Sequence, residues 1–538
     1  MITKNGKGVF GGVAFGKIKI YKDKREVKKY FVSDTDGEKK RFAEARKKAY
    51  GKTVELMEKT RKDVGQKEAD IFEVHSMMIN DEDFIRLAES KIENGINAEA
   101  AITEAGKETA ELFYSLNDEY MKQRAADVID VAERITDELE GGKNENEISK
   151  EKTIIVSYDL TPSQTAGLRD RNISGFVTEG GSESSHTAIL ARTMNIPAII
   201  GVKGILDEAY DGRFAAIDSS SGTIYIEPNE TTIKRLEHKK EENENETQIL
   251  QKYKGKSTET KSGKKIMLYA NISNMTDLDM VIANDAEGIG LFRSEFIFMG
   301  RDTFPSENEQ FEIYKNAVEK MNGRRVIIRT LDIGADKKVE YFNIPKEENP
   351  ALGYRAIRIC LDRVNIFKSQ LRAILRASAY GKAAVMFPMI CTEEELIKSK
   401  KILNEAMLEL DFERIRYDRN IEVGIMIETP AAALISDTLA KECDFFSIGT
   451  NDLTQYTLAV DRQNSMVNEK FSTDHESILK LIKMTAENAK REGIWTGICG
   501  ELGADKRLTE RFINWGIDEL SVSPVYILGL RKFIRETE

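Results

Sequence analysis

One histidine in this chain stands where phosphoryl chemistry is possible. Residues 180–192 read Gly-Gly-Ser-Glu-Ser-Ser-His-Thr-Ala-Ile-Leu-Ala-Arg, and they bring His186 to the start of a helix predicted from the apolar spacing that follows. Ser184 and Ser185 are typical N-cap residues, and the first turn of a helix presents unpaired N–H groups that bind anions. The positive end of the helix also favours a neutral, nucleophilic imidazole. The pattern indicates either a histidine that accepts a phosphoryl group or a capping, buried histidine.

A second set of polar side chains follows short apolar segments in the second half of the chain. Eight such segments have the pattern of short buried strands, and most are separated by residues with the apolar spacing of helices. This alternation predicts a (β/α)8 barrel. The active site of such a barrel lies at the carboxyl ends of its strands, and charged or polar residues follow five of the segments directly. Packing alone explains this poorly. The candidate site residues are Arg293, Arg329, Glu428, Asn451, Asp452, Arg462 and Cys499.

The arginines of this set fit a small substrate with several negative charges. Arg293 and Arg329 can each bind a phosphate or a carboxylate through two donors, because a guanidinium group is fork-shaped. Arg462 can complete the clamp, and the side-chain amide of Asn451 can donate to a phosphate. These residue types predict a site for a phosphorylated carboxylic acid or a similar anion.

The acidic residues and the thiol suggest how such an anion would react. Glu428 and Asp452 are hard oxygen ligands with no histidine or thiolate beside them, which fits Mg²⁺ or Mn²⁺. Cys499 is either inert packing or a proton donor or nucleophile at the barrel mouth. Together with His186, the set favours phosphoryl transfer from a small anionic donor.

Sequence patterns along the chain predict the domains that position these side chains. Residues 1–21 and 144–230 contain short apolar segments typical of strands, interrupted by glycines. Residues 22–143 lack proline and have apolar residues at helical spacing. We expect a multidomain α/β protein in which the first two segments form one α/β domain with a helical bundle inserted in it. A charged helical linker, residues 231–258, then leads to the TIM barrel, residues 259–538.

Composition excludes several classes of protein. The net charge of −11 argues against a general nucleic-acid binder. No apolar run approaches membrane-spanning length, and the first residues lack the apolar stretch of a signal peptide. The four cysteines are widely spaced without a Cys-x-x-Cys pair, so a zinc site or a disulfide framework is not expected. We therefore expect a cytoplasmic protein without a nucleic-acid or membrane partner.

The barrel motifs resemble those of one known family. The segments are Ile-Gly-Thr-Asn-Asp-Leu-Thr-Gln-Tyr-Thr (448–457), Gly-Ile-Met-Ile-Glu-Thr-Pro-Ala-Ala (424–432), Asn-Pro-Ala-Leu-Gly-Tyr-Arg-Ala-Ile-Arg (349–358) and Gly-Ile-Cys-Gly-Glu-Leu (497–502). They resemble enzyme I of the bacterial phosphoenolpyruvate:sugar phosphotransferase system, and the similarity runs from Gly12 to about Arg531.

The resemblance implies an activity, its partners and its residues. A family member transfers the phosphoryl group of phosphoenolpyruvate to its own histidine, here His186, then to the histidine-containing phosphocarrier protein HPr, and releases pyruvate. It implies that the α/β domain swivels between two sites, that the inserted bundle binds HPr, and that Thr165 orients the histidine. We also expect a homodimer formed through the barrel. By matching motif, Arg293, Arg329, Asn451, Asp452 and Arg462 bind phosphoenolpyruvate, Glu428 and Asp452 hold Mg²⁺, and Cys499 protonates the enolpyruvate carbon.

One departure from the family pattern keeps a second hypothesis open. The family usually has Gly-Gly-Arg-Thr-Ser before the histidine, whereas this chain has Glu183 where the arginine is expected. A specialised paralogue or a regulatory protein of the same fold that senses phosphoenolpyruvate is the alternative function. A relative of pyruvate,phosphate dikinase or phosphoenolpyruvate synthase would need a further nucleotide-binding domain, for which the sequence has no room.

Overall fold

The computed structural model describes all residues except 22–26, 64–65, 116–118, 142–150, 161–171, 182–184, 186, 189, 192–195, 276, 300, 335–336, 338, 462–463, 465 and 468–471. Two predicted site residues, His186 and Arg462, therefore lie outside the described residues, as do Thr165 and Glu183. The chain divides into two compact units, Met1–Glu246 and Thr247–Glu538.

The first unit contains a mixed sheet of eight strands in the order β1-β8-β7-β3-β4-β5-β6-β2. β3 and β4 lie far apart in the sequence but pair in parallel, from Lys17↔Thr153 to Ile20↔Val156. The helices between them are therefore an insertion that leaves the sheet continuous. The strands are β1 (Ile2–Asn5), β2 (Lys7–Phe10), β3 (Val13–Ile20), β4 (Thr153–Ser157), β5 (Ile173–Thr178), β6 (Ala198–Ile200), β7 (Phe214–Asp218) and β8 (Thr223–Ile226), with a 3₁₀ turn, η1 (Glu208–Tyr210), before β7.

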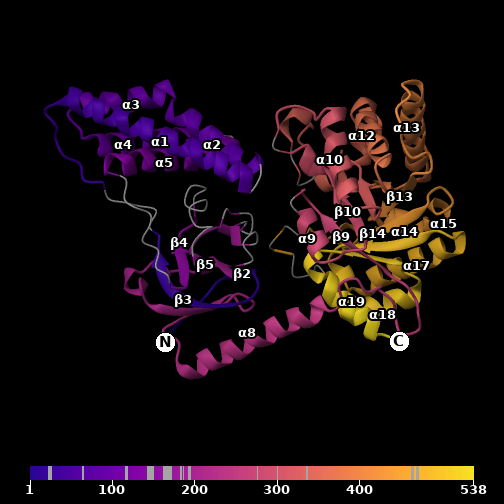
Figure 1. Ribbon diagram of the computed structural model, residues 1–538. Helices are drawn as coiled ribbons and strands as arrows, with labels where there is room; N and C mark the ends of the chain where they lie inside the picture. Colours follow the sequence, from indigo (N-terminus) through magenta and orange to yellow (C-terminus); the bar gives the residue numbers. More distant parts are fainter. Residues whose placement is uncertain are drawn as a thin grey trace. The chain divides into compact units, whose positions relative to one another are not determined.

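The inserted helices form a bundle with an apolar core of its own, which includes Phe42, Ile102 and Val131 (Figure 1). An ion-pair cluster ties α1 to α4, because the guanidinium of Arg41 contacts Glu38 at 2.6 Å and Glu99 at 2.7 Å. The described helices of the bundle are α1 (Thr35–Asp63), α2 (Gln66–Ile79), α3 (Glu82–Glu93), α4 (Ala98–Ser115) and α5 (Glu119–Leu139).

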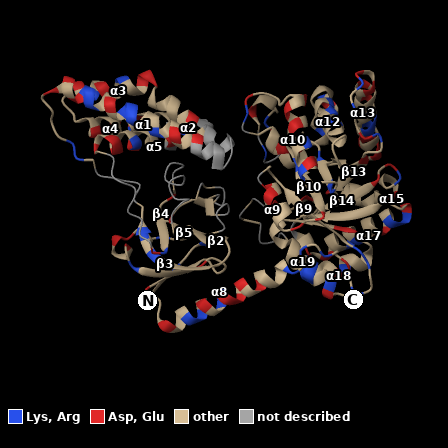
Figure 2. Ribbon diagram, in the orientation of Figure 1, with Lys and Arg blue, Asp and Glu red and all other residues tan. Residues whose placement is uncertain are grey.

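Helix α8 (Glu230–Gln251) follows the sheet and carries charged residues along most of its length, as Figure 2 shows. Its first half nevertheless packs on the sheet. Leu236 is buried in a small cluster with Val13, and the ammonium group of Lys239 lies 2.6 Å from the carboxylate of Asp218. These contacts attach the start of α8 to the first unit.

The second unit contains a closed barrel of eight parallel strands in which β16 pairs with β9 to complete the ring. Closure leaves no unpaired strand edge. The strands are β9 (Met267–Ile272), β10 (Gly288–Arg293), β11 (Arg325–Arg329), β12 (Ala383–Phe387), β13 (Glu422–Ile427), β14 (Phe445–Gly449), β15 (Trp495–Cys499) and β16 (Glu519–Val522).

Helices follow most of these strands and cover the outside of the barrel. The α-helices are α9 (Asp277–Ala283), α10 (Glu307–Lys320), α11 (Ile357–Asp362), α12 (Val364–Ser378), α13 (Glu393–Phe412), α14 (Pro430–Leu434), α15 (Ser436–Leu439), α16 (Thr450–Leu458), α17 (Glu476–Glu492), α18 (Lys506–Trp515) and α19 (Ile527–Glu536). The 3₁₀ turns are η2 (Ser294–Ile297), η3 (Glu340–Phe342), η4 (Pro350–Leu352), η6 (Glu501–Ala504) and η7 (Pro524–Tyr526).

Strand geometry sorts side chains between the two faces of the barrel. Successive residues point to opposite sides, so Ile327, Met426 and Cys499 pack in the interior, while Ile328 and Ile427 join the larger core beneath the helices. The predicted fold class, a multidomain α/β protein with a helical insertion and a C-terminal eight-stranded barrel, is confirmed. In the part of the chain that the structure describes, no helix has the length and apolar character needed to cross a membrane.

A buried arginine joins the last helix to the base of the barrel. Arg531 on α19 is fully buried, and its guanidinium contacts Asp285 at 2.7 Å and the hydroxyl of Thr258 at 3.0 Å. We expect Arg531→Met to lower the free energy of unfolding by about 1–3 kcal/mol, because it leaves the half-buried carboxylate of Asp285 and the hydroxyl of Thr258 with fewer partners. Calorimetric unfolding of the full chain measures this loss. Lys532→Met, which removes the same charge from the next residue, is the control, and equal losses would contradict the prediction.

Candidate active site

Two arginines predicted from the sequence end neighbouring strands of the barrel. Arg293 and Arg329 are paired residues in the register of β10 and β11. Their surroundings differ, because Arg293 is exposed whereas Arg329 is 5% exposed. The structure thus brings both to the carboxyl end of the barrel, one facing solvent and one embedded.

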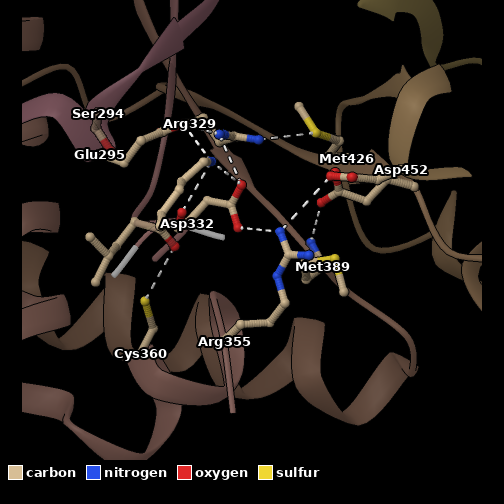
Figure 3. A network of polar contacts seen from close by, with 12 residues as sticks. Ser294, Glu295, Arg329, Asp332, Arg355, Cys360, Met389, Met426 and Asp452 are labelled. Carbon is tan, nitrogen blue, oxygen red and sulfur yellow. Dashed lines mark hydrogen bonds and ion pairs between the residues drawn. The ribbon is translucent and has the colours of Figure 1, made fainter. Parts of the chain in front are cut away.

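Arg329 belongs to a buried ion-pair network that Figure 3 shows from close by. Its guanidinium lies 2.6 Å from Glu295 and 3.0 Å from Asp332. The ammonium group of Lys337 contacts the same two carboxylates, at 2.7 Å and 2.9 Å. Arg355 approaches Asp332 from the other side, at 2.9 Å. Asp332 therefore lies among three cations.

These cations determine the ionisation of the two acids. Burial by itself would raise the pKa of Asp332, but Arg329, Lys337 and Arg355 together hold it well below its usual value. The pKa of Glu295 is lowered in the same way, chiefly by Arg329 and Lys337 against the cost of burial. Both acids are therefore carboxylates at neutral pH, and they orient the cations at this end of the barrel.

Glu428 behaves in the opposite way. It directly follows β13, is 1% exposed and accepts a hydrogen bond of 2.6 Å from the backbone N–H of Met389. Burial, followed by the charges of Asp452 and Asp332, raises the pKa of Glu428 to about 8 against the opposing effect of nearby arginines. The charge of Asp452 thus destabilises the ionised form of Glu428.

Asp452 and Asn451 are placed by the first turn of α16, directly after β14. Asp452 lies 3.9 Å from the guanidinium of Arg355, which stands between it and Asp332 (Figure 3). The side-chain oxygen of Asn451 is buried, and no residue in the described part of the chain bonds to it. The two side chains keep polar groups available beside the network.

The two acids Glu428 and Asp452 fit a divalent cation. Both offer oxygen, the donor that Mg²⁺ prefers, and a bound cation would relieve the repulsion that raises the pKa of Glu428. Among the described residues, no group of three or more acidic, histidine or cysteine side chains forms a complete metal site. Such a cation would therefore take its remaining ligands from water or substrate oxygens.

Cys499 ends β15 inside the barrel and is 3% exposed. Its sulfur accepts a hydrogen bond from the hydroxyl of Ser447 at 3.0 Å, and the thiol lies 3.6 Å from the carbonyl of Ile448. Burial raises the pKa of the thiol to about 12, a rise that the Ser447 hydroxyl only partly opposes. Cys499 is therefore a protonated thiol at neutral pH, suited to packing or to proton donation rather than to nucleophilic attack.

Close packing at this end of the barrel requires a glycine after Cys499. Gly500 has a φ of 136°, and a Cβ atom added there would lie 2.5 Å from the hydroxyl of Thr450. A side chain would therefore strain the backbone and displace the start of α16, which carries Asp452.

Sequence reasoning found some members of this site and missed others. It placed Arg293, Arg329, Glu428, Asp452 and Cys499 at strand ends, and the structure brings all five to the same end of the barrel. Glu295, Asp332 and Lys337 also follow strands, but no role had been assigned to them. Arg355 lies within the motif segment 349–358, but it was assigned no role, because it precedes α11 rather than ending a strand.

Family models cover nearly the whole chain. They are described as the PEP-binding domain of PEP-utilising enzymes (residues 247–538), the N-terminal domain of these enzymes (residues 5–124) and their mobile domain (residues 149–222).

Full-length relatives agree with these matches. The chain is 42% identical over 506 residues to a phosphoenolpyruvate-protein phosphotransferase from Staphylococcus carnosus. The aligned region covers 94% of this chain and 88% of that protein. It is 40% identical over 540 residues to the protein of the same name from Priestia megaterium, with 99% and 94% coverage, and 42% identical over 530 residues to that from Haemophilus influenzae, with 97% and 92% coverage.

The network gives a testable dependence of stability on pH. We expect Asp332→Asn to lower the free energy of unfolding by about 3–5 kcal/mol at pH 7, because the buried Arg329 and Arg355 and the half-buried Lys337 lose a shared anion. The pKa of Asp332 is depressed in the folded state, so its contribution is present above the usual value of 3.8 and is lost as the pH falls through the folded value. Urea unfolding should therefore give a gap that narrows as the pH falls below about 5, whereas above pH 5 the gap also changes because the charge of Asp332 contributes to the raised pKa of Glu428.

The exposed Asp302 offers a matched control for this experiment. Asp302→Asn makes the same chemical change outside the network and should leave the free energy of unfolding unchanged within about 0.5 kcal/mol. A gap between wild type and Asp332→Asn that widens in acid would contradict the assigned charge of Asp332.

Proposed function

The chain belongs to the phosphoenolpyruvate-protein phosphotransferases, the enzyme I family of the bacterial phosphotransferase system, and we propose that His186 accepts the phosphoryl group. The protein transfers phosphate from phosphoenolpyruvate to protein in this system. One observation carries the assignment of the site. Arginines, a carboxylate pair and a protonated thiol meet at the carboxyl end of the barrel.

In this proposal the barrel binds phosphoenolpyruvate through the cations and amide at its carboxyl end. The Nε atom of Arg329 is buried without a hydrogen-bond partner in the described part of the chain, as is the side-chain oxygen of Asn451. Buried polar groups are normally paired, so a bound anion is a reasonable partner for Arg329. Arg293 stands exposed at the next strand end, and Asp452 lies 3.9 Å from Arg355. Arg462 is assigned by its motif alone.

The reaction then consists of a phosphoryl transfer, in which one bond to phosphorus forms and another breaks, followed by a proton transfer to carbon. A ring nitrogen of His186 forms a bond to phosphorus as the bond between phosphorus and the enol oxygen breaks. The enolate that remains takes a proton at its methylene carbon, and the S–H bond of Cys499 supplies it. The raised pKa of Cys499 supports this role, since it keeps the thiol protonated before the reaction.

We assign Mg²⁺ to Glu428 and Asp452, for the reasons of charge and donor type given above. When bound, it offsets negative charge on the oxygens of the substrate. Arg355 and Met389 position this pair, through the contact of Arg355 with Asp452 and the N–H that Met389 donates to Glu428.

The other units of the chain take the remaining roles in this proposal. The domain formed by residues 1–21 and 144–230 carries the phosphoryl group and swivels, and the inserted helices, residues 22–143, bind HPr as the phosphocarrier. Residues 231–258 link them to the barrel, residues 259–538, through which the protein forms a homodimer in the cytoplasm. The complete set of strand-end residues gives the alternative of a purely regulatory sensor no support.

Labelling with phosphoenolpyruvate tests whether His186 is the phosphoryl acceptor. Phosphoenolpyruvate labelled in its phosphoryl group should place an acid-labile label on His186 in the presence of Mg²⁺, and a chelator should stop the labelling. His186→Ala should abolish it, while calorimetric titration shows phosphoenolpyruvate affinity within about threefold of wild type. His238→Ala, at an exposed histidine of α8, is the matched control and should label normally. A label that persists in His186→Ala would overturn the assignment.

A second variant tests the proton donor. Cys499→Ala should slow pyruvate formation by about 10²–10⁴-fold, the usual value of general acid catalysis, while phosphoenolpyruvate still binds. Cys443→Ala removes another buried thiol that lies on the outer side of the barrel and should leave the rate unchanged. If pyruvate forms in Cys499→Ala within about threefold of the wild-type rate, Cys499 is a packing residue only.

A further inference from the structure

A buried amide on helix α12 lies against the strand ends that carry Arg293 and Arg329, and the mechanism above does not use it. Gln370 is 1% exposed and belongs to the buried face of α12, beside Phe367 and Leu371. An amide in such a place costs stability unless its polar atoms are hydrogen-bonded. The partners of Gln370 therefore show what the side chain holds in place.

This amide ties two strand ends together. Its nitrogen donates to the hydroxyl of Ser294 at 2.9 Å, and its oxygen accepts from the backbone N–H of Leu331 at 2.8 Å. Ser294 directly follows Arg293, and Leu331 lies two residues after Arg329. Gln370 thus connects the segment that leaves β10 to the segment that leaves β11.

The surrounding groups fix the orientation of the amide. Only its oxygen can accept from the N–H of Leu331, so its nitrogen faces the hydroxyls of Ser294 and Tyr314, the latter at 3.0 Å. Burial raises the pKa of Tyr314, so this hydroxyl stays protonated and donates to the side-chain oxygen of Gln310 at 3.4 Å. Both the nitrogen and the oxygen of Gln370 are engaged, which leaves the amide one orientation.

The strand ladder does not by itself set the spacing of the two arginines. Between the paired positions of Ile289 and Phe292, two residues of β10 oppose one residue of β11, which is a local bulge. A bulge bends its strand and re-aims the side chains that follow, here that of Arg293. A contact beyond the bulge can hold the end of β10 against β11, and Gln370 makes such a contact.

We propose that Gln370 is a positioning residue that sets the spacing of Arg293 and Arg329 for the two anionic groups of phosphoenolpyruvate. The proposal rests on the proposed function, in which both arginines bind this substrate through its phosphate and its carboxylate. Gln370 does not touch the substrate, because it is buried and its amide is engaged by the protein. Donors that bind two groups of one molecule must stand at a fixed separation, and a misplacement of about 1 Å can cost on the order of 10²-fold in rate.

Calorimetric titration with phosphoenolpyruvate and Mg²⁺ tests the proposal. The full chain carries His186→Ala as the parent, so that no phosphoryl group is transferred during the titration. Gln370→Met replaces the amide with an unbranched apolar side chain and removes the three hydrogen bonds described above. We expect its Kd for phosphoenolpyruvate to be at least about tenfold above that of the parent. A Kd within about twofold of the parent would overturn the proposal.

Gln310→Met is the matched control. Gln310 is also 1% exposed and also bonds to Tyr314, but its nitrogen donates to the carbonyl of Pro305 rather than to a strand end. Both variants should lower the midpoint of thermal unfolding, whereas only Gln370→Met should weaken the binding of phosphoenolpyruvate. Equal weakening in the two variants would show that Gln370 has a structural role only.

A smaller change keeps the test decisive even if Gln370→Met does not fold. Ser294→Ala removes one hydrogen bond of the amide and leaves the other two in place. The loss of one such bond should raise the Kd for phosphoenolpyruvate by about fivefold. An unchanged Kd in Ser294→Ala would contradict the proposal.

The two halves of the reaction supply a second readout, measured with His186 intact. Transfer from phosphorylated HPr to His186 does not use the barrel, so Gln370→Met should carry it out at the wild-type rate. Transfer from phosphoenolpyruvate should instead show a KM at least about tenfold higher. A loss of rate in both directions would mean that the variant disturbs the whole chain, which would overturn the positioning role.

A double variant distinguishes failure of this proposal from failure of the proposed function. Arg293→Lys keeps a charge but loses the two-donor fork, and in this background Gln370→Met should raise the Kd by a smaller factor than in the parent. The same factor in both backgrounds would overturn the proposal while leaving the proposed function intact. If Arg293→Lys itself binds phosphoenolpyruvate as the parent does, the assigned role of Arg293 is wrong, and the role of Gln370 falls with it.

Discussion

The ion-pair network around Asp332 is the constraint on which the candidate active site depends. A carboxylate that is 1% exposed cannot remain ionised unless cations offset the loss of water, and here Arg329, Lys337 and Arg355 do so. Each of these cations comes from a different position in the chain, so the network also draws those segments together. The positive groups at this end of the barrel are therefore held in place by a buried anion.

Acids of opposite character lie close to one another in this barrel. Asp332 and Glu295 are carboxylates because cations surround them, whereas Glu428 has a raised pKa because burial and neighbouring acids outweigh the arginines near it. Deeper inside, burial raises the pKa of Glu519 well above its usual value, and Arg325, which is paired with Glu422, opposes this rise only in part. Such divergence within one site is typical of enzymes that bind charge and move protons together.

The first unit shows how a helical bundle can be inserted without disturbing a sheet. β3 and β4 pair directly, so the helices between them begin and end at adjacent points of one sheet. The inserted bundle has its own apolar core and its own ion pairs, such as those of Arg41. The docking role proposed for the bundle and the carrier role proposed for the sheet thus belong to elements with separate cores.

The sequence by itself determined the barrel and most of the strand-end residues. Eight apolar segments with polar residues after them suffice, because the carboxyl ends of parallel strands in a closed barrel must meet at one end. The assignments of His186 and Arg462 depend on motif and resemblance, since both residues lie outside the described part of the chain. Only the tertiary structure decided the partners of Arg329, the place of Arg355, and the raised pKa values of Cys499 and Glu519. Burial and the distance between charges set these properties, and both arise from contacts between residues far apart in the sequence.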